Sequence, residues 1–313
     1  MTHNADSVSP RWKLAMVIVG EGDAEAALVV DEHFFAFDMH PRARQLIGHD
    51  GPTTVFEVLQ RWSEWEPLLA EIAASVDEPE GLAAEDVILR APVPRPRKVF
   101  CAGANYASHV REMGTEVPDK TRTNPYFFMK PPTAVIGPNE AIRIPAMTEQ
   151  VDWEVELAAY IGKTAKNVSI DRAAEHVAGY TILNDISARD THRRADWGQG
   201  PFYWDWLQSK GCDTFAPTGP FFVPRSQVTN PYDLRLSLSV NEEVMQDSNT
   251  NDLIFNVEEQ IAYLSSFITL EPGDIISTGT PPGVGMPRGI FLKRGDEVVA
   301  TIEQIGVLRN RVM

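Results

Sequence analysis

The feature that most constrains the fold begins near Val99, where the chain becomes a series of short β-type runs separated by Pro and Gly. Runs of this length between turn residues are typical of strands, because Pro and Gly interrupt longer regular elements. Helical signals are few here, chiefly DRAAEHV, with Ser169 as a candidate N-cap, and NVEEQIAYLSSFI. The sequence therefore predicts a β-rich α+β fold. The candidate strands are AVIGP, AIRIP, VELAAYIG, GYTILND, LRLSLSV, DIISTGT and DEVVATIEQIGVLRNRV.

Residues 11–90 show a different pattern, which predicts a small α+β domain. Three strand-like runs, LAMVIVG, AALVV and HFFAFDM, precede an amphipathic stretch that begins at Thr53, where apolar side chains recur every three or four residues. The stretch 91–97 then carries three prolines, which break helix and ladder alike. We therefore expect a disordered segment over 1–10, the small domain over 11–90, a Pro-rich linker over 91–97 and the main domain over 98–313.

The charge balance excludes several classes of partner. The chain has 44 Asp and Glu against 28 Lys and Arg, a formal net charge of −16, which repels phosphate backbones and anionic lipid surfaces. No apolar run approaches the ~18 residues of a membrane span, and the first residues lack the apolar core of a signal peptide. Two cysteines, Cys101 and Cys212, are too few for a disulfide framework. We therefore expect a cytoplasmic protein that binds neither nucleic acid nor membranes.

Carboxylates alternate with apolar residues in VDWEVELAAYIG, so Asp152, Glu154 and Glu156 would share one face of a strand. Neighbouring side chains on one face lie about 7 Å apart, and like charges at that distance repel unless a cation lies between them. Hard divalent ions such as Mg²⁺, Mn²⁺ or Ca²⁺ prefer such oxygen ligands. Asp185 ends the apolar run of GYTILND and is a candidate third ligand. The alternatives are a solvated edge strand for the glutamates and a simple turn for Asp185.

A histidine and a glutamate follow the glycine turn in VFCAGANYASHVREMG. His109 and Glu112 are three residues apart and would face the same way on a short helix. A carboxylate that accepts a hydrogen bond from one imidazole nitrogen makes the other nitrogen a better general base. The alternative is a surface salt bridge on a loop helix.

Six ordered segments together resemble the fumarylacetoacetate hydrolase superfamily, in particular its bacterial 2-hydroxyhepta-2,4-diene-1,7-dioate isomerase and acylpyruvate hydrolase branch. The resemblance covers 98–313 and implies a mixed β-roll catalytic domain, usually a homodimer. It also implies Mg²⁺ or Mn²⁺ held by the residues that match the family's ligands, Glu154, Glu156 and Asp185. The six segments are GANYASHVREM, PYFFMKPPTAVIGP, DWEVELAAYIG, NDISARD, SKGCDTFAPTGP and STGTPPGVG.

The same resemblance implies roles for further residues. His109 and Glu112 match a dyad that activates water. Lys210 and Arg189 match positions that support the substrate and the developing enolate. Thr280 matches a contact to the substrate carboxylate, and Lys130 lies in a segment that lines the pocket.

One departure from the family pattern concerns His192, where family members commonly carry Gln. His192 could donate a hydrogen bond to the substrate, titrate as a second acid–base group, or lie on a helix surface. An aromatic stretch follows, and we interpret its side chains as core packing more readily than as pocket wall. These side chains are Trp197, Phe202, Tyr203, Trp204 and Trp206.

The predicted function is divalent-metal-dependent hydrolysis of a C–C bond in a small 1,3-diketo or 2-oxo acid, such as an acylpyruvate, through a metal-stabilised enolate. The same intermediate could instead serve a decarboxylase, isomerase or hydratase of aromatic catabolism. A second alternative is an inactive protein that only binds a small acid.

Overall fold

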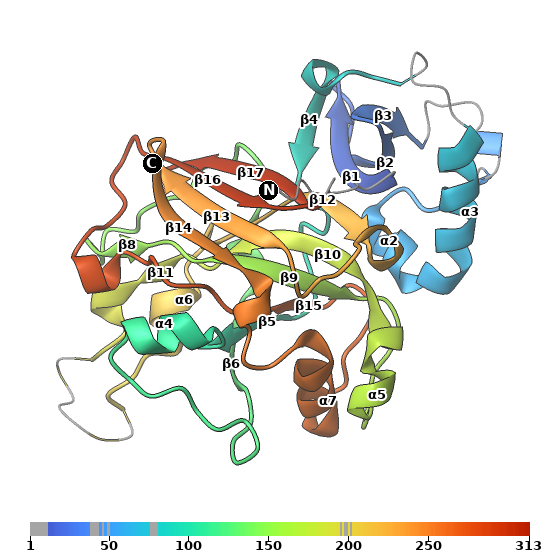
Figure 1. Cartoon of the computed structure of the whole chain (residues 1–313). Coiled ribbons are helices and arrows are strands. Elements are labelled where there is room, and N and C mark those ends of the chain that lie inside the picture. Colours follow the sequence, from blue (N-terminus) through green and yellow to red (C-terminus); the bar gives the residue numbers. More distant parts are fainter. Residues whose placement is uncertain are drawn as a thin grey trace, which may run out of the picture.

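The structure is a computed structural model that describes residues 12–37, 44–45, 47–48, 51–75, 81–194, 196, 200 and 202–313. Within these residues an 11-stranded sheet, a four-stranded sheet and a two-stranded ladder form a strand-rich molecule with few helices (Figure 1). The predicted β-rich α+β fold is confirmed. The predicted disordered segment 1–10 lies outside the described residues. No helix in the described part is long and apolar enough to cross a membrane.

The N-terminal strands form one end of the large sheet. Strand β1 pairs antiparallel with β2 and β4, and β2 pairs with β3. Helices α2 and α3 lie beside these strands (Figure 1). The bounds are β1 (Trp12–Val19), β2 (Glu25–Val30), β3 (His33–Ala36), α2 (Val55–Gln60), α3 (Trp62–Ser75) and β4 (Val87–Arg90).

The amphipathic stretch from Thr53 forms two helices rather than one. Thr54 begins α2 with a capping box, in which its side chain accepts from the Glu57 N–H and Glu57 accepts from the Thr54 N–H. Arg61 then leaves the helical backbone, with φ −131° and ψ 39°. The periodicity of the apolar side chains continues across this break, so the pattern alone does not reveal it.

The large sheet continues from the N-terminal strands into the main domain, because β1 also pairs with β12 (Ala216–Pro224) at Leu14 and Phe222. The Phe222 ring is fully buried and packs edge-on against Trp62 at 5.0 Å and against Tyr160 at 5.7 Å. Residues 91–97 are neither helix nor strand. The predicted domain boundaries remain a prediction, and Phe222 joins the two sides across them.

Two fully buried strands, β9 (Val155–Ile161) and β10 (Val177–Asn184), form the centre of the large sheet. Their near-continuous apolar sequences fit burial on both faces. Beyond β9 the sheet continues through β15, β5 and β6, and short β7 pairs with β12. The bounds are β5 (Val99–Gly103), β6 (Tyr126–Lys130), β7 (Val135–Ile136) and β15 (Ile275–Ser277).

A four-stranded antiparallel sheet packs against these central strands (Figure 1). Its strands alternate buried and exposed residues, and inward side chains such as Leu236, Leu238 and Ala300 join the core of Val155 and Leu157. The bounds are β13 (Arg235–Val240), β14 (Glu243–Asn249), β16 (Glu297–Ile302) and β17 (Gly306–Arg311). The predicted single run DEVVATIEQIGVLRNRV therefore forms two strands, β16 and β17.

The remaining elements are short and surround the strands. Ser169 is the N-cap of α5, as predicted, although its side chain makes no capping hydrogen bond. The predicted strand AIRIP is wrong, because only Ile142 makes an isolated bridge, to Val312, before Pro145 ends the segment. The bounds are α4 (Ala107–Glu112), β8 (Val151–Asp152), α5 (Ile170–Ala173), β11 (Ser187–Ala188), α6 (Trp206–Lys210) and α7 (Val257–Phe267).

We expect Phe222→Ala to destabilise the protein by about 3–5 kcal/mol, because it leaves a cavity where β1 meets β12. Urea unfolding followed by tryptophan fluorescence measures the loss. Phe267→Ala is the matched control, since its ring is 55% exposed, and it should cost less than about 1 kcal/mol. Equal losses in the two variants would show that Phe222 contributes no more to stability than the exposed Phe267 does.

Candidate active site

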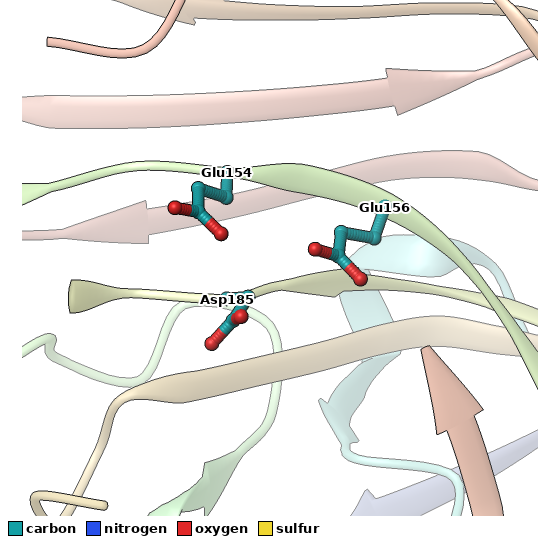
Figure 2. Close-up of side chains that lie close together, drawn as sticks. All are labelled: Glu154, Glu156 and Asp185. Atoms are coloured by element: carbon teal, nitrogen blue, oxygen red, sulfur yellow. The ribbon is translucent and has the colours of Figure 1, made fainter. Parts of the chain in front are cut away.

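Three carboxylates converge where β9 begins and β10 ends. Glu154 immediately precedes β9, Glu156 is the second residue of β9, and Asp185 follows the last residue of β10. One oxygen from each lies within 4.8 Å of the others, and the three side chains point into one space (Figure 2). None is more than 6% exposed. The solvated-edge alternative for the glutamates is therefore wrong, and Asp185 does more than form a turn.

The strand predicted to run through Asp152, Glu154 and Glu156 is interrupted at Trp153 and Glu154. There the backbone pairs with side chains instead of a ladder. The Glu154 N–H donates to the Asn184 side chain at 2.9 Å, and the Val155 N–H donates to Gln246 at 3.0 Å. Asp152 is not among the converging acids, and its carboxylate accepts from the backbone of 285–286 instead. Asn184 and Gln246 are supporting residues that no sequence pattern singled out.

Glu156 has one oxygen with no partner. Its Oε2 accepts from the Ser277 hydroxyl at 2.6 Å and from the Gly279 N–H at 2.8 Å, whereas Oε1 is buried without a hydrogen bond. Burial, reinforced by the Asp185 and Glu154 charges, raises the pKa of Glu156 well above its usual value. A buried, unpaired carboxylate oxygen beside two other carboxylates fits a hard cation as its missing partner.

Lys210 lies between two of the acids. Its ammonium is 2.7 Å from Glu154 Oε2 and 2.8 Å from Asp185 Oδ2. Burial alone would lower the pKa of Lys210, but the Asp185 and Glu154 charges outweigh burial and raise it. Burial likewise would raise the pKa of Glu154, yet Lys210 and Arg189 outweigh it and lower that pKa to about 2. Glu154 is thus held ionised.

Lys130 lies behind Asp185 and is only 1% exposed. Its ammonium lies 2.8 Å from Asp185 Oδ1 and forms an ion pair with it, although the contact does not have the geometry of a hydrogen bond. It also donates to the backbone carbonyls of Ile186, at 2.9 Å, and Lys210. Lys130 therefore cross-links the backbone around the acids, and it is not among the residues that line the pocket.

Arg189 joins two acids that the strand break separates. Its Nε is 2.8 Å from Asp152 and its Nη2 is 2.5 Å from Glu154. Asp152, fully buried, also accepts from the backbone N–H groups of Gly285 and Met286. Asp152 thus holds Arg189 and the 285–286 backbone together. The alternation of acidic and apolar residues could not distinguish this supporting role from metal binding.

The His109–Glu112 pair is present, with His109 buried and Glu112 half-buried. His109 Nδ1 lies 2.9 Å from Glu112 Oε2, and His109 is 7% exposed, so the surface salt-bridge alternative is wrong. The other Glu112 oxygen accepts from the Gly283 N–H at 2.8 Å. The same loop supplies the Gly279 N–H to Glu156, so one loop holds both the pair and one of the converging acids.

Asn105 fixes the turn that leads into α4. Its side chain donates to the carbonyls of Phe255 and Thr278, at 2.9 and 2.7 Å, and accepts from the Phe255 N–H. The preceding residue, Ala104, has a positive φ of 51°. Asn105 stands in the GANYASH segment, but only the structure shows that it anchors the helix of His109.

The STGTPPGVG segment supplies backbone N–H groups to three different carboxylates. Gly279 donates to Glu156, Gly283 to Glu112 and Gly285 to Asp152. Gly283 has φ +104°, and a Cβ there would lie 2.1 Å from the Met245 carbonyl oxygen, so only glycine fits. Thr280 in the same segment donates to the Val155 carbonyl and accepts from Gln246, so its hydroxyl supports the loop.

A pocket of about 600 Å³ lies next to the acids and shares Arg189 with them. Trp204 and Trp206 line this pocket, so the core-packing interpretation is wrong for these two residues. Phe202 is 57% exposed and is not core either, and Trp197 lies outside the described residues. The remaining lining residues are Met113, Tyr126, Gln150, His192, Arg193 and Met286.

His192 lies in the pocket wall against two indole rings. Its ring centroid is 4.1 Å from that of Trp206 and 5.1 Å from that of Trp204. Burial, followed by the Lys210 and Arg189 charges, lowers the pKa of His192 to about 4. His192 is therefore neutral near pH 7 and is suited to hydrogen bonding rather than to titration.

A protein-family comparison bears on this site. Residues 98–313 match the family model described as fumarylacetoacetate (FAA) hydrolase C-terminal. The chain belongs to this family. Its members include hydrolases, isomerases and tautomerases, and the chain is an enzyme of this group.

Three relatives illustrate that range. Oxaloacetate tautomerase FAHD2A, mitochondrial, of Bos taurus is 47% identical over 234 residues, which cover 74% of this chain and 71% of the relative. The solved 2-hydroxyhepta-2,4-diene-1,7-dioate isomerase of Mycobacterium marinum has TM-score 0.69 and 33% identity, covering 96% of this chain and 98% of the other. The fumarylpyruvate hydrolase of Pseudomonas aeruginosa, solved with Mn²⁺ and pyruvate, has TM-score 0.61 and 38% identity, covering 70% and 90%.

We expect opposite responses when Glu156 and Glu154 are changed to Gln in protein treated with EDTA at pH 7. Glu156→Gln should leave the melting temperature unchanged or raised, because Gln resembles the protonated acid that burial favours. Glu154→Gln should lose on the order of 3 kcal/mol, because the depressed pKa of Glu154 contributes stability at every pH above its usual value of 4.5.

Added Mg²⁺ or Mn²⁺ should raise the melting temperature of the wild type but not of Glu156→Gln. Equal destabilisation of both variants in EDTA would contradict the conclusion that Glu156 Oε1 has no partner. An undiminished response of Glu156→Gln to the ions would remove Glu156 from the ligand set.

Proposed function

We propose that this protein is a divalent-cation-dependent enzyme that moves a proton beside the 2-oxo group of a small 2-oxo acid. The first candidate reaction is the keto–enol tautomerisation of oxaloacetate or a related acid. The second is hydrolysis of a C–C bond in an acylpyruvate or a fumarylacetoacetate-like diketo acid. The observation that carries both is the His109–Glu112 pair, held by the same loop as Glu156 of the three converging carboxylates.

Glu154, Glu156 and Asp185 would hold Mg²⁺ or Mn²⁺. Four buried acids, these three and Asp152, face the three cationic side chains of Lys130, Lys210 and Arg189, so ionised Glu156 would add a negative charge that these cations do not compensate. The donors are all oxygen, and the solved fumarylpyruvate hydrolase relative contains Mn²⁺. When bound, such an ion supplies a Lewis acid for the oxygens of a 2-oxo acid.

His109 would carry the proton. Glu112 accepts from Nδ1, which leaves Nε2 as the basic nitrogen, and the Gly283 N–H keeps Glu112 in place. In the keto-to-enol direction Nε2 takes a proton from the carbon beside the 2-oxo group, and the 2-oxo oxygen is protonated. In the reverse direction the enol oxygen loses its proton, and the carbon receives one from His109. In hydrolysis Nε2 takes a proton from water, which adds to the distal carbonyl, and the C–C bond breaks to release an enolate that is then protonated.

Lys210 and Arg189 would stabilise the negative charge that develops in either reaction. Lys210 is buried and already lies among the acids, and Arg189 both contacts Glu154 and lines the pocket. Fixed cations in a site that excludes water stabilise developing charge strongly. Neutral His192 would donate or accept a hydrogen bond on the substrate without adding charge.

Tautomerisation is the first candidate reaction because the bovine relative, which is 47% identical, is named an oxaloacetate tautomerase. It also requires only one base and no positioned water. Hydrolysis is placed second because the fumarylpyruvate hydrolase relative is 38% identical and belongs to the same family. The shared pair of His109 and Glu112 serves either proton transfer.

An assay panel with Mg²⁺ and with Mn²⁺ separates the reactions. Loss of enol absorbance from oxaloacetate, without pyruvate release, indicates a tautomerase. Pyruvate release from fumarylpyruvate or other acylpyruvates indicates a hydrolase, and pyruvate from oxaloacetate indicates a decarboxylase. Binding of these acids with no turnover on any of them would contradict the proposal and favour an inactive binding protein.

We expect His109→Ala to lower kcat by about 10²–10⁴, the usual contribution of a general base, on whichever substrate is turned over. Calorimetric affinity for Mn²⁺ should be unchanged, whereas Asp185→Asn should weaken it strongly. His33→Ala is a suitable control, because His33 lies on β3 among the N-terminal strands and touches only the Asp31 carbonyl among the hydrogen bonds of the described residues. Full activity of His109→Ala would discard the proposed dyad.

A further inference from the structure

We infer that Arg193 is a specificity-determining residue. It binds an anionic group at the solvent side of the substrate, opposite the end that lies toward Glu154, Glu156 and Asp185. The inference rests on the proposed function, because it concerns the same pocket. It predicts a preference for 2-oxo acids that carry a second carboxylate beyond a flat, apolar segment.

The first observation is the placement of Arg193. It lines the pocket together with Trp204, and its guanidinium carbon lies 5.1 Å from the Trp204 ring centroid and 5.9 Å from that of Tyr203. The backbones of Arg193 and Trp204 also form an isolated antiparallel bridge. A guanidinium held over an aromatic face keeps its N–H edge available for a planar acceptor such as a carboxylate.

The second observation is the charge around the pocket. Arg189 and Arg193 are the cationic side chains among its lining residues, and Arg189 is already paired with Asp152 and Glu154. Among the described residues no carboxylate lies within ion-pair distance of Arg193. Its neighbour Arg194, in contrast, is 3.2 Å from Asp196. In a chain of net charge −16, an Arg without a carboxylate partner in a pocket wall indicates that the ligand supplies the negative group.

The third observation is the apolar lining that accompanies the two arginines. Tyr126, Trp204 and Trp206 provide aromatic surface in the pocket, and Met113 and Met286 provide adaptable apolar surface. The volume of about 600 Å³ is within the range of pockets for ligands much larger than oxaloacetate. An aryl or conjugated segment would therefore fit between the 2-oxo acid end and the second carboxylate.

Calorimetric titration into the Mn²⁺-loaded protein tests this with phenylpyruvate and para-carboxyphenylpyruvate, which differ only in the distal carboxylate. The wild type should bind the diacid roughly tenfold more tightly, since a charge-assisted hydrogen bond at a partly exposed site is of that strength. The preference should shrink as the salt concentration rises, because the contact is electrostatic.

Three variants locate the preference. Arg193→Gln should abolish it, and Arg193→Lys should restore part of it. Arg194→Gln is the matched control, because it removes the same charge from the adjacent residue, which pairs with Asp196 and does not line this pocket. It should retain the preference of the wild type.

The outcomes separate this inference from the proposed function. If the wild type binds both ligands equally, or if Arg193→Gln keeps the preference, the Arg193 subsite is overturned while binding of the 2-oxo acid end still stands. If neither ligand binds, the proposed function is overturned and this inference with it.

Discussion

The structure around the site depends on burying several carboxylates within a few ångströms of one another. Moving ions out of water is costly unless each one is paired and hydrogen-bonded. Here Lys210, Lys130 and Arg189 surround Glu154 and Asp185, and backbone N–H groups hold Glu156 and Asp152. The pairing leaves Glu156 Oε1 and Asp185 Oδ1 without hydrogen bonds, both buried. Asp185 Oδ1 still has the Lys130 ammonium beside it, whereas Glu156 Oε1 has no ion pair among the described residues. Glu156 Oε1 and the neighbouring oxygens of Glu154 and Asp185 therefore define the position suited to a cation.

This arrangement draws on segments far apart in the chain. The paired strands β9 and β10 bring the acids together, while the loop that follows β15 holds three carboxylates through Gly279, Gly283 and Gly285. The His109–Glu112 pair and Glu156 therefore share one support. The solvent side of the pocket is built differently, from Trp204, Trp206 and Arg193, which make no contact with Glu156 or Asp185 among the hydrogen bonds and ion pairs of the described residues.

Local sequence patterns predicted much of this site, for identifiable reasons. A two-residue period placed Glu154 and Glu156 on one face, a strand end placed Asp185 nearby, and a three-residue spacing paired His109 with Glu112. Long-range partners were not predictable. Nothing around Gln246, on exposed β14, indicates that its amide reaches the Val155 backbone, and no pattern reveals that β1 pairs with β12. The aromatic stretch was assigned to the core because composition cannot distinguish a buried ring from one that lines an opening.

The shared glycine loop has a consequence for how this enzyme could diversify. A change that shifts Gly283 would disturb the orientation of Glu112, and through the neighbouring Gly279 and Gly285 it would disturb Glu156 and Asp152 as well. Inherited variation in that loop would therefore be strongly constrained. The wall of Arg193 and Trp204 donates no hydrogen bond to these carboxylates among the described residues, so single replacements there would leave the three acids and the His109–Glu112 pair in place.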